Sequence, residues 1–537
     1  MSITHPDKDP LRYDALGLWN LYFLVKLGLY FSDVIDLHVL ENIAFIAFLL
    51  LPFKHLILIK IKHIVAIVVA LFLLHYDSYL PPLQRLLESG DLLSDFSFPY
   101  LIELLSRFLS WQFVAMALVV VIVYIYLVNW VRFTTVSIAG VLYIGFLQFF
   151  ATQDISSTQP ILVKNNGQPN SNQSQAQSAL NPEQSIETFY QQQSRLRTEF
   201  PSSNSGGDFD IVLLNVCSLG WDDLERVNLA KHALFNQFDL LFDNFSSATS
   251  YSGPAGIRLL KASCGQTSHQ GLYTDANKQC YLFENLANLG FDNDFAMNHN
   301  GNFDNFLGMV ESQGRVDAKL QSLSGVKIAQ RSFDGTPIFD DGQVLNKWLK
   351  SRLTSSKPRA ALYYNTISLH DGNVIEGRSK FGSSLKSYGT RTEILFKQFD
   401  QFFERLEQSG RNYMVVMVPE HGASLTGDKM QIAGMRDIPS PAILDIPVGV
   451  KFIGPKVKSN SAQKIISEPS SYLAISELIA RATRQNQFEG GLDLAELAAD
   501  LPKTPMIGEN SGTRMQMFNG KPYIQLDDGD WMVYPGY

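Results

Sequence analysis

The distribution of apolar residues divides the chain into three parts. Residues 1–150 are dense in Leu, Ile, Val and Phe, residues 151–207 contain few of them, and residues 208–537 have the balance of a globular domain. A chain of 537 residues is long enough for two or three domains. We therefore predict a transmembrane domain over residues 1–150, a flexible polar linker over 151–207 and a water-soluble domain over 208–537.

The apolar part contains five runs that predict membrane-spanning helices, each of which needs about 20 mostly apolar residues. The clearest run, Phe113–Val128, is apolar on every face and is flanked by Trp111 and Trp130 as interfacial anchors. This argues against the alternative of a helix buried in a soluble core. The other predicted spans are Leu16–Phe31, Val39–Phe53, Ile64–His75 and Thr134–Phe150. The second and third runs are short, so their boundaries stay open.

Basic residues between the spans predict their orientation. They precede the first span and fill the turns between spans two and three and between spans four and five, so with five spans they all face one side. The opposite side carries Asp33, Asp36 and Glu41. By the positive-inside rule the basic side is cytoplasmic, which places the soluble domain outside the cytoplasm. The basic residues are Lys8, Arg12, Lys54, His55, Lys60, Lys62, His63 and Arg132.

Residues 151–207 are polar and of low complexity, with stretches such as NNGQPNSNQSQAQSALNPEQS. Such a composition cannot bury enough apolar surface to fold alone. We expect a flexible tether with a short helix around Ile186–Arg197.

Three short apolar runs in the last part predict strands buried on both faces, as parallel strands are. They are Asp210–Val216, Ala360–Ser368 and Tyr413–Val418. Helical patterns lie between them, for example over Asp222–Phe235 and Thr392–Gln408. Alternating strands and helices predict an α/β fold with a mostly parallel central sheet.

Reactive side chains follow these strands, at the edge where α/β sheets bind their ligands. Cys217 follows the first strand, His370 the second, and Glu420 and His421 the third. Thiolate, carboxylate and imidazole together favour zinc. Each residue alone has a simpler explanation, because a cysteine can fill a core and a histidine or glutamate can cap a strand end.

Ser252 is the candidate nucleophile. Pro254 marks the first turn of a helix predicted over Gly253–Ala262, which places Ser252 at its N-cap. A helix N-terminus offers free amide donors that suit a phosphate, and a nearby metal would lower the pKa of the hydroxyl. The alternative is a serine that only caps the helix.

Charge and cysteine content narrow the function classes. The net charge of −8 and the lack of a concentrated basic stripe argue against a nucleic-acid partner. The chain has three cysteines, Cys217, Cys264 and Cys280, which allow three single-disulfide pairings. The latter two can pair in an oxidising compartment, but the sequence alone leaves this open.

Several segments resemble the bacterial cellulose phosphoethanolamine transferases, whose broader relatives are the lipid A phosphoethanolamine transferases of the alkaline phosphatase superfamily. The resemblance covers the whole chain. It is carried by NVCSLGWDDL (215–224), SYSGPAGIRLLKASCGQTSH (250–269), MNHNGNF (297–303), SLHDGN (368–373), VPEHGAS (418–424) and the terminal GDWMVYPGY. It implies an N-terminal five-helix transmembrane bundle followed by an alkaline-phosphatase-like α/β domain.

The resemblance also implies a reaction and a place in the cell. The chain is expected to be a multi-pass protein of the bacterial inner membrane with its catalytic domain in the periplasm. Phosphoethanolamine would pass from phosphatidylethanolamine to glucose hydroxyls of cellulose, with O6 the expected acceptor, through a covalent phosphoethanolamine-enzyme intermediate. The cellulose synthase complex is the implied partner.

Site roles follow residue by residue from the resemblance. They are Ser252 as nucleophile, Cys217, Ser252, Glu420 and His421 as zinc ligands, His370, Tyr251 and Arg436 as further active-site residues, and Cys264–Cys280 as a disulfide. His370 is a candidate general acid or base, with a phosphate-binding or packing histidine as the alternative. The lipid A branch has a threonine nucleophile, a carboxylate in place of Cys217 and Asp-His in place of Glu420-His421, so its metal affinity does not transfer to this chain.

Two other function classes stay open. One is a related phosphodiesterase, sulfatase or phosphoglycerol transferase, because these motifs do not specify the donor. The other is a non-catalytic scaffold of the cellulose secretion machine, which needs neither zinc ligands nor a nucleophile.

Overall fold

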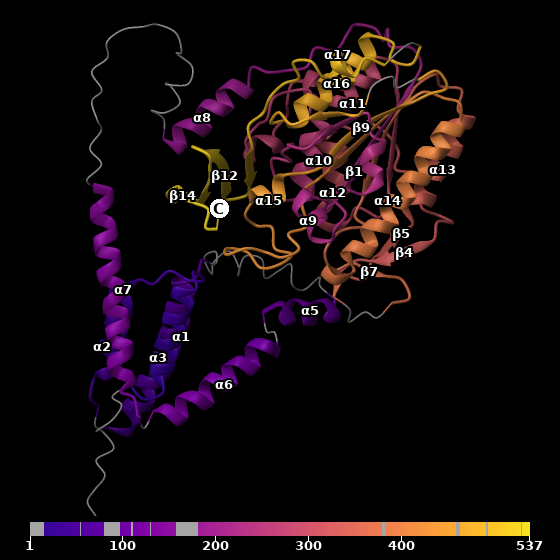
Figure 1. Ribbon diagram of the computed structural model, residues 1–537. Coiled ribbons are helices and arrows are strands. Elements are labelled where there is room, and N and C mark those ends of the chain that lie inside the picture. The colour runs from indigo at the N-terminus through magenta and orange to yellow at the C-terminus, as the bar shows by residue number, and fades with distance from the viewer. Residues whose placement is uncertain are drawn as a thin grey trace, which may run out of the picture. The chain divides into compact units, whose positions relative to one another are not determined.

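The computed structural model describes residues 16–53, 55–79, 97–108, 111–128, 130–156, 181–378, 383–457, 462–489, 492–527 and 529–536. The chain divides into two compact units (Figure 1). The first comprises residues 1–90 and 105–170, and the second comprises residues 91–104 and 171–537.

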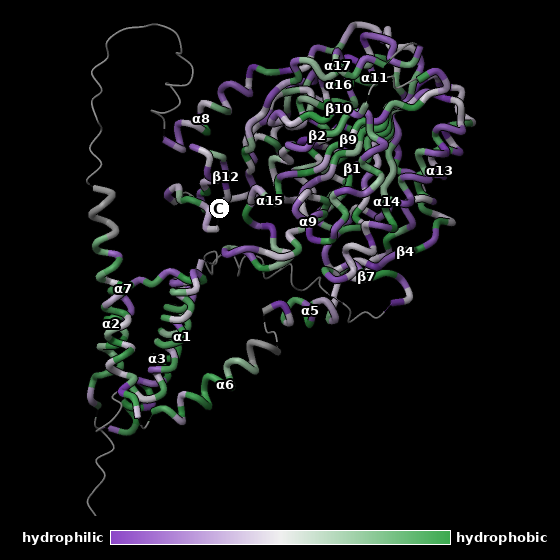
Figure 2. The backbone as a smooth tube through the Cα atoms, in the orientation of Figure 1, coloured by the Kyte–Doolittle hydropathy of each residue, from purple (hydrophilic) through white to green (hydrophobic). Residues whose placement is uncertain are grey.

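The first unit consists of apolar helices. They are α1 (Trp19–Phe31), α2 (Val39–Leu50), α3 (Leu56–Tyr76), α6 (Trp111–Leu127) and α7 (Phe133–Ser156). Each overlaps one of the five predicted spans, and Figure 2 shows them hydrophobic along most of their length. Among the described residues, Leu56–Tyr76 and Phe133–Phe150 are long and apolar enough to cross a membrane, whereas Val39–Leu50 and Ala115–Leu127 are shorter. The apolar helices are thus present, and a bundle of five spans stays a prediction.

The helix α3 begins eight residues before the predicted third span, at Leu56 rather than Ile64. Lys60, Lys62 and His63 were expected in a loop but lie in its first turns. Lysine is a good helix former, and its long side chain reaches polar groups from an apolar helix. Lys62 Nζ donates to the carbonyl oxygen of Leu49 at 2.9 Å.

A buried polar cluster joins the first three helices. Lys26 of α1 forms an ion pair with Asp77, which follows α3. Lys26 Nζ also donates to Asn42 Oδ1 of α2 at 2.7 Å, and Asn42 Nδ2 donates to Asp77 Oδ2 at 2.9 Å. Charges in an apolar environment are tolerated only when paired, so this cluster fixes how α1, α2 and α3 align.

The second unit is built around a seven-stranded sheet with the order β10-β2-β9-β8-β1-β6-β3. Its strands are β1 (Asp210–Val216), β2 (Leu240–Phe242), β3 (Asp292–Met297), β6 (Ala360–Thr366), β8 (Tyr413–Pro419), β9 (Val448–Ile453) and β10 (Lys464–Ile466). The strand β9 is antiparallel to both neighbours and the other pairs are parallel, so the sheet is mixed. The predicted strands β8, β1 and β6 are adjacent and fully buried.

Helices cover both faces of this sheet (Figure 1). One face carries α10 (Ser252–Leu260), α11 (Leu282–Asn288), α12 (Phe306–Ser312), α16 (Tyr472–Arg484) and α17 (Leu494–Ala498). The other carries α9 (Trp221–Arg226), α13 (Asp341–Thr354) and α14 (Ser384–Gln408). Alternate residues of β1 enter the two cores: Ile211 and Leu213 pack on the first face, Val212 and Leu214 on the second.

Smaller elements complete the second unit. A sheet β5-β4-β7 and a sheet β11-β12-β13-β14 flank the core. The helix α5 (Phe98–Phe108) crosses the boundary between the units, with residues 98–104 in the second and 105–108 in the first. The remaining elements of the second unit are α8 (Pro182–Gln193), α15 (Pro441–Leu444), η3 (Ala233–Gln237), η4 (Gln270–Tyr273), η5 (Lys278–Cys280), η6 (Phe303–Asn305), β4 (Ile328–Arg331), β5 (Pro337–Phe339), β7 (Val374–Ile375), β11 (Ile507–Asn510), β12 (Thr513–Phe518), β13 (Lys521–Leu526) and β14 (Met532–Val533).

The helix predicted over Asp222–Phe235 is interrupted. The helix α9 ends at Arg226, and Asn228 adopts a left-handed backbone with φ of 60°, which ends the helix. The second predicted helix, Thr392–Gln408, begins earlier than expected, at Ser384.

Part of the predicted linker packs against the second unit. Asn181 and Gln184 form a capping box at the start of α8. Glu183 pairs with Arg514 at 3.2 Å, and Ile186 and Phe189 pack on Ile507 of β11. The compact unit therefore begins before Asp208, while residues 157–180 of the predicted linker lie outside the described residues.

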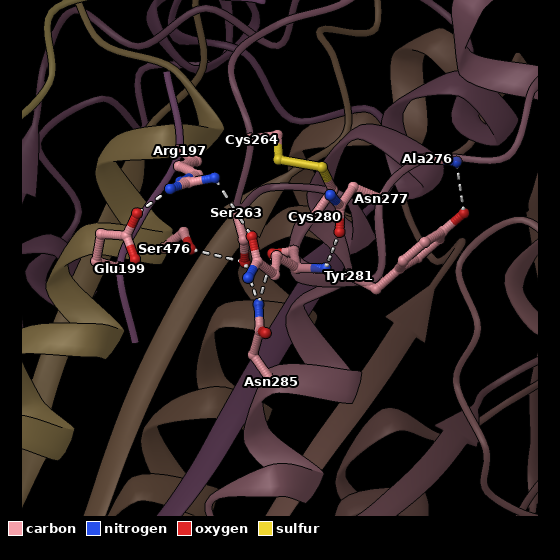
Figure 3. The surroundings of a disulfide bond; sticks show 11 residues. Arg197, Glu199, Ser263, Cys264, Ala276, Asn277, Cys280, Tyr281, Asn285 and Ser476 are labelled. Atoms are coloured by element: carbon pink, nitrogen blue, oxygen red, sulfur yellow. Dashed lines mark hydrogen bonds and ion pairs between the residues drawn. A yellow bond between two sulfur atoms is a disulfide. The ribbon is translucent and has the colours of Figure 1, made fainter. Parts of the chain in front are cut away.

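A disulfide joins Cys264, which follows α10, to Cys280 of η5 across a sequence separation of 16. This is the pairing that the family resemblance implied. Figure 3 shows it beside a hydrogen-bonded cluster, in which Asn285 Nδ2 and Ser476 Oγ donate to Ser263 Oγ at 3.1 and 3.0 Å. The disulfide thus closes the η4–η5 loop over a region that ties α10 to α11 and α16.

Replacing both Cys264 and Cys280 by serine is expected to lower the free energy of unfolding by about 3 kcal/mol, since the bond restricts a loop of this length in the unfolded chain. Urea unfolding of the fragment from Asn181 would measure the change. Reducing agent should lower the stability of the parent fragment and leave the double variant unaffected. Equal stability of the two fragments under oxidising conditions would contradict the expectation.

Candidate active site

Four of the residues singled out in the sequence meet at the carboxyl edge of the sheet. Cys217 follows β1, Glu420 and His421 follow the adjacent parallel strand β8, and Ser252 begins α10. One ligand atom from each of Cys217, Glu420 and His421 lies within 4.8 Å of the others. Ser252 Oγ is 3.4 Å from Cys217 Sγ and 3.4 Å from His421 Nε2. Because parallel strands end at the same edge, distant segments deliver a thiol, a carboxyl, an imidazole and a hydroxyl to one place.

The chemistry of this cluster fits a divalent cation. Glu420 is fully buried, and its Oε2 has no hydrogen-bond partner among the described residues. His421 donates from Nδ1 to the carbonyl oxygen of Gly422 at 2.9 Å, which leaves Nε2 as an acceptor directed at Ser252. A buried carboxylate oxygen without a partner is costly, and a metal ion would satisfy it. Cys217, Glu420 and His421 supply the mixed ligands that zinc accepts.

Burial sets the protonation of these groups. It raises the pKa of the Cys217 thiol to about 12, with the nearby Glu420 charge acting in the same direction. It also raises the pKa of Glu420 and lowers the pKa of His421 well below its usual value. The imidazole is therefore neutral and available as a ligand, while the thiol and carboxyl are acids whose charged forms a bound cation would favour.

The hydroxyl of Ser252 does not cap its helix. Ser252 was predicted at the N-cap, but the N-cap is Tyr251, and Ser252 is the first helical residue. No side chain caps this end of α10. The Ser252 hydroxyl instead faces Cys217 and His421, so the capping explanation is wrong.

Arg436 and His370 lie beside the cluster. Arg436 Nη1 donates to Ser218 Oγ at 3.0 Å, and its Nη2 lies 3.5 Å from His370 Nε2. The Nε atom of Arg436 is buried and has no hydrogen-bond partner within the described ranges. No ion pair is found for Arg436 among the described residues. Its guanidinium can therefore donate further hydrogen bonds to a ligand bound beside Ser218 and His370.

His370 has a defined tautomer. Its Nδ1 donates to the carbonyl oxygen of Asp371 at 2.7 Å, which leaves the lone pair on Nε2. Burial and the Arg436 charge lower the pKa of His370 to about 4. The imidazole is neutral at pH 7, and its Nε2 can accept a proton or hydrogen bond. Tyr251 is 40% exposed beside Ser252, which suits a wall of the site.

Hydrogen bonds from neighbouring strands orient the carboxylate of Glu420. Asn365 Nδ2 donates to Glu420 Oε1 at 2.6 Å and to Asn215 Oδ1 at 2.9 Å. His299 donates from Nε2 to Asn365 Oδ1 at 2.8 Å. Asn215 and Asn365 are direct neighbours on β1 and β6. In the sequence, each of these asparagines is a polar residue inside an apolar strand. That feature could have marked both as candidate site residues, but neither was predicted.

Asp223 holds the loop that follows His421. It accepts hydrogen bonds from the backbone amides of Ala423 and Leu425. A Cβ atom added to Gly422 would lie 3.0 Å from Asp223 Oδ2 and 3.1 Å from the carbonyl oxygen of Ala442. The close packing at Gly422 therefore favours glycine directly behind His421.

Ser218, directly after Cys217, adopts a left-handed backbone with φ of 61°. Non-glycine residues rarely do so, and such strain concentrates at functional sites. The conformation turns the chain sharply after β1 and places the Ser218 hydroxyl 3.3 Å from Cys217 Sγ.

The fold and site define an α/β unit that carries a Cys-Glu-His cluster beside a serine hydroxyl, joined in one chain to apolar helices. The chain belongs to the BcsG family of cellulose biosynthesis proteins. Residues 165–531 match the BcsG C-terminal domain and residues 19–146 match the BcsG N-terminal domain. The cellulose biosynthesis protein BcsG of Escherichia coli K12 is 40% identical over 97% of this chain and 96% of its own length. The BcsG protein of Salmonella typhimurium LT2 has the same identity and coverage.

Solved structures show weaker similarity. A protein in the alkaline phosphatase superfamily from Vibrio parahaemolyticus covers 66% of this chain and 88% of its own, with 12% identity and a TM-score of 0.46. The C-terminal periplasmic domain of EptC from Escherichia coli covers 59% of this chain and 93% of its own, with 13% identity and a TM-score of 0.41.

Proposed function

We propose that this chain is a zinc-dependent transferase that moves phosphoethanolamine from phosphatidylethanolamine to glucose hydroxyls of cellulose. One observation carries the proposal: a serine hydroxyl lies 3.4 Å from two members of a buried Cys-Glu-His cluster at the carboxyl edge of an α/β sheet. Membership of a cellulose biosynthesis family supports cellulose as the acceptor. The sequence resemblance to cellulose phosphoethanolamine transferases supports the transferred group.

Cys217, Glu420, His421 and Ser252 would hold the zinc ion. When bound, zinc supplies Lewis-acid stabilisation of negative charge and lowers the pKa of the Ser252 hydroxyl. The orientation of the ligands comes from the chain itself, since Asn365 fixes Glu420 and the Gly422 carbonyl fixes the tautomer of His421.

Ser252 Oγ acts as the nucleophile in two displacements. In the first, it bonds to the donor phosphorus as the bond to the diacylglycerol oxygen breaks, leaving phosphoethanolamine on Ser252 and a proton on the leaving alcohol. In the second, a glucose hydroxyl, with O6 the expected position, bonds to that phosphorus as the bond to Ser252 breaks. His370 Nε2 is the proposed proton carrier: it takes the proton of the Ser252 hydroxyl and gives it to the leaving diacylglycerol oxygen. In the second displacement it takes the proton of the glucose hydroxyl and returns it to Ser252 Oγ as the bond from phosphorus to serine breaks.

Arg436 is proposed to bind the phosphate oxygens. Its buried Nε lacks a partner, and its Nη2 lies 3.5 Å from His370 Nε2. A phosphate between the two would satisfy the guanidinium through charge-assisted hydrogen bonds. Its negative charge would also raise the pKa of His370 from about 4 toward neutrality, which suits a proton carrier.

The apolar helices are proposed to anchor the chain in the bacterial inner membrane as a multi-pass protein, with residues 208–537 in the periplasm. The donor is a membrane lipid, so anchoring places the catalytic unit near its supply. The cellulose synthase complex is the proposed partner that delivers the nascent glucan.

Phosphatidylethanolamine is expected to be the preferred donor over phosphatidylglycerol by at least about tenfold in kcat/KM. The purified full chain in vesicles would be given each lipid with a radiolabelled headgroup and a soluble cello-oligosaccharide acceptor. Label on the oligosaccharide from the first lipid alone supports the proposal. Equal transfer from both lipids would favour a phosphoglycerol transferase, and no transfer from either would favour a scaffold.

A further inference from the structure

The helix α5 has two chemically distinct faces. Phe98, Ile102 and Leu105 recur at helical spacing and are 70%, 42% and 58% exposed. Tyr100 and Glu103 project from the opposite side and are partly buried. One face of the helix is therefore an exposed apolar stripe, and the other carries polar groups that bind neighbours.

The polar face binds the loop that carries His370. The hydroxyl of Tyr100 donates to Asp371 Oδ2 at 2.9 Å. Glu103 Oε1 accepts from the backbone amide of Ser384 at 2.9 Å. The Ser384 hydroxyl lies 2.8 Å from Glu103 Oε1 and 2.6 Å from Asp371 Oδ1, so it bridges the two carboxylates. Residues 97–104 belong to the same compact unit as this loop.

The contact between α5 and this loop reaches His370 through Asp371. The backbone carbonyl of Asp371 accepts the hydrogen bond that fixes the tautomer of His370. From the other side, Arg391 Nη1 donates to the carbonyl oxygens of Ser368 and His370 at 2.8 and 3.0 Å, and its Nη2 donates to Ser384 at 3.1 Å. The His370 loop is thus held by Arg391 from α14 and by Tyr100 and Glu103 from α5.

The chain itself indicates what covers the apolar stripe. The helix α5 ends at Phe108, and the apolar helix α6 begins at Trp111. Upstream, the segment that leads to α5 leaves α3, which is long and apolar enough to span a membrane. A short helix with an apolar face, connected so closely to an apolar helix that is proposed to lie in the membrane, is expected to lie in the bilayer surface.

We propose that α5 is an interfacial helix whose Phe98, Ile102 and Leu105 face rests in the outer leaflet of the inner membrane, while Tyr100 and Glu103 position the His370 loop. The positioning role of Tyr100 and Glu103 rests on the proposed function, because it assumes that His370 transfers protons in the reaction. The site assembles around His370 when α5 is seated on the lipid surface, so proton transfer to the leaving diacylglycerol takes place at the bilayer. Tyr100 and Glu103 are positioning residues, because they act through Asp371.

The membrane contact can be tested without any activity. Spin labels would be attached to Phe98→Cys and Leu105→Cys in the full chain reconstituted in phosphatidylethanolamine–phosphatidylglycerol vesicles. Leu353→Cys serves as control, since Leu353 is 48% exposed on α13. Labels on α5 are expected to collide more with oxygen than with a water-soluble nickel chelate, and the label on α13 the reverse. Identical collision ratios at all three positions would overturn the lipid contact.

The positioning role is tested by kinetics. The variant Tyr100→Phe with Glu103→Leu is expected to lower kcat by roughly tenfold to a hundredfold on a soluble phosphoethanolamine ester, with KM little changed, because a displaced loop misplaces His370. The control Tyr126→Phe with Glu311→Leu changes exposed residues on α6 and α12 and should behave as the parent.

Each outcome separates the two proposals. An unchanged kcat in the double variant of α5, with an active parent, would overturn the positioning role. A parent chain inactive on both the ester and the lipid would instead overturn the proposed function, and the spin-label result would still decide the lipid contact. If the double variant does not fold, Tyr100→Phe alone, which keeps the ring and Glu103, provides the same comparison.

Discussion

Replacing Ser252 by alanine is expected to lower the kcat of phosphoethanolamine transfer by roughly 10⁴-fold or more. In the proposed mechanism the hydroxyl oxygen bonds to phosphorus, and Ser252 Oγ lies 3.4 Å from both Cys217 Sγ and His421 Nε2. Ser252 does not cap α10, so its loss should leave the fold intact. Transfer of labelled headgroup to a cello-oligosaccharide by the full chain measures the effect.

The matched control is Ser312→Ala, which removes an exposed serine from α12. It should retain parent activity. Mass spectrometry of the parent, stopped before acceptor is added, should find phosphoethanolamine on a peptide that contains Ser252. Substantial turnover by the Ser252→Ala chain would mean that another group attacks the donor.

Replacing Cys217 by alanine is expected to eliminate stoichiometric zinc and the stability that zinc provides. Cys217 is fully buried at the end of β1, and its thiol shares the cluster with Glu420 and His421. A ligand bound only by the folded state stabilises it by about 4 kcal/mol at a free concentration a thousandfold above Kd. The parent should therefore unfold at higher urea with zinc than with chelator, and the Cys217→Ala chain should unfold at the same urea in both.

Metal analysis after dialysis gives the second readout. The parent is expected to retain about one zinc per chain, since the cluster offers one set of ligands. The control is the double variant Cys264→Ser and Cys280→Ser. It replaces the two cysteines that are not part of the cluster, so it should keep its zinc. A parent chain that binds no zinc, or a Cys217→Ala chain that binds it equally, would refute this site.

The strands that build the site were accessible from the sequence because their signal is local. Runs such as Asp210–Val216 and Tyr413–Val418 are apolar on both faces, and each is followed within two residues by a reactive side chain. A parallel sheet brings strand ends together whatever their separation in the chain. The convergence of Cys217, Glu420 and His421 therefore follows from topology, and the structure places them together.

The contacts that support the site were not accessible because they depend on partners far apart in the chain. Asn365 donates to Glu420 across the sheet, and its position inside an apolar strand marks it as unusual without identifying its partner. Tyr100 lies 271 positions before Asp371, between the third and fourth predicted spans. Similarly, β9 runs antiparallel because of its connection, which apolar pattern alone does not encode.

Helix ends were predicted less well than helix positions. The proline rule correctly located the first turn of α10, but it could not decide between Tyr251 and Ser252 as the N-cap. The difference of one position matters, because the hydroxyl of a capping serine would accept a hydrogen bond from a backbone amide of the helix. The tertiary packing of α10 against the sheet leaves the hydroxyl facing the cluster.

The central claim is that Ser252 of this chain transfers phosphoethanolamine to cellulose. Solid-state phosphorus NMR of extracellular cellulose from cells that express the parent or the Ser252→Ala chain tests it most directly. The account predicts a phosphodiester signal in the parent cellulose and its absence in the variant, with the same amount of cellulose exported. A signal of equal strength in both samples would contradict the account.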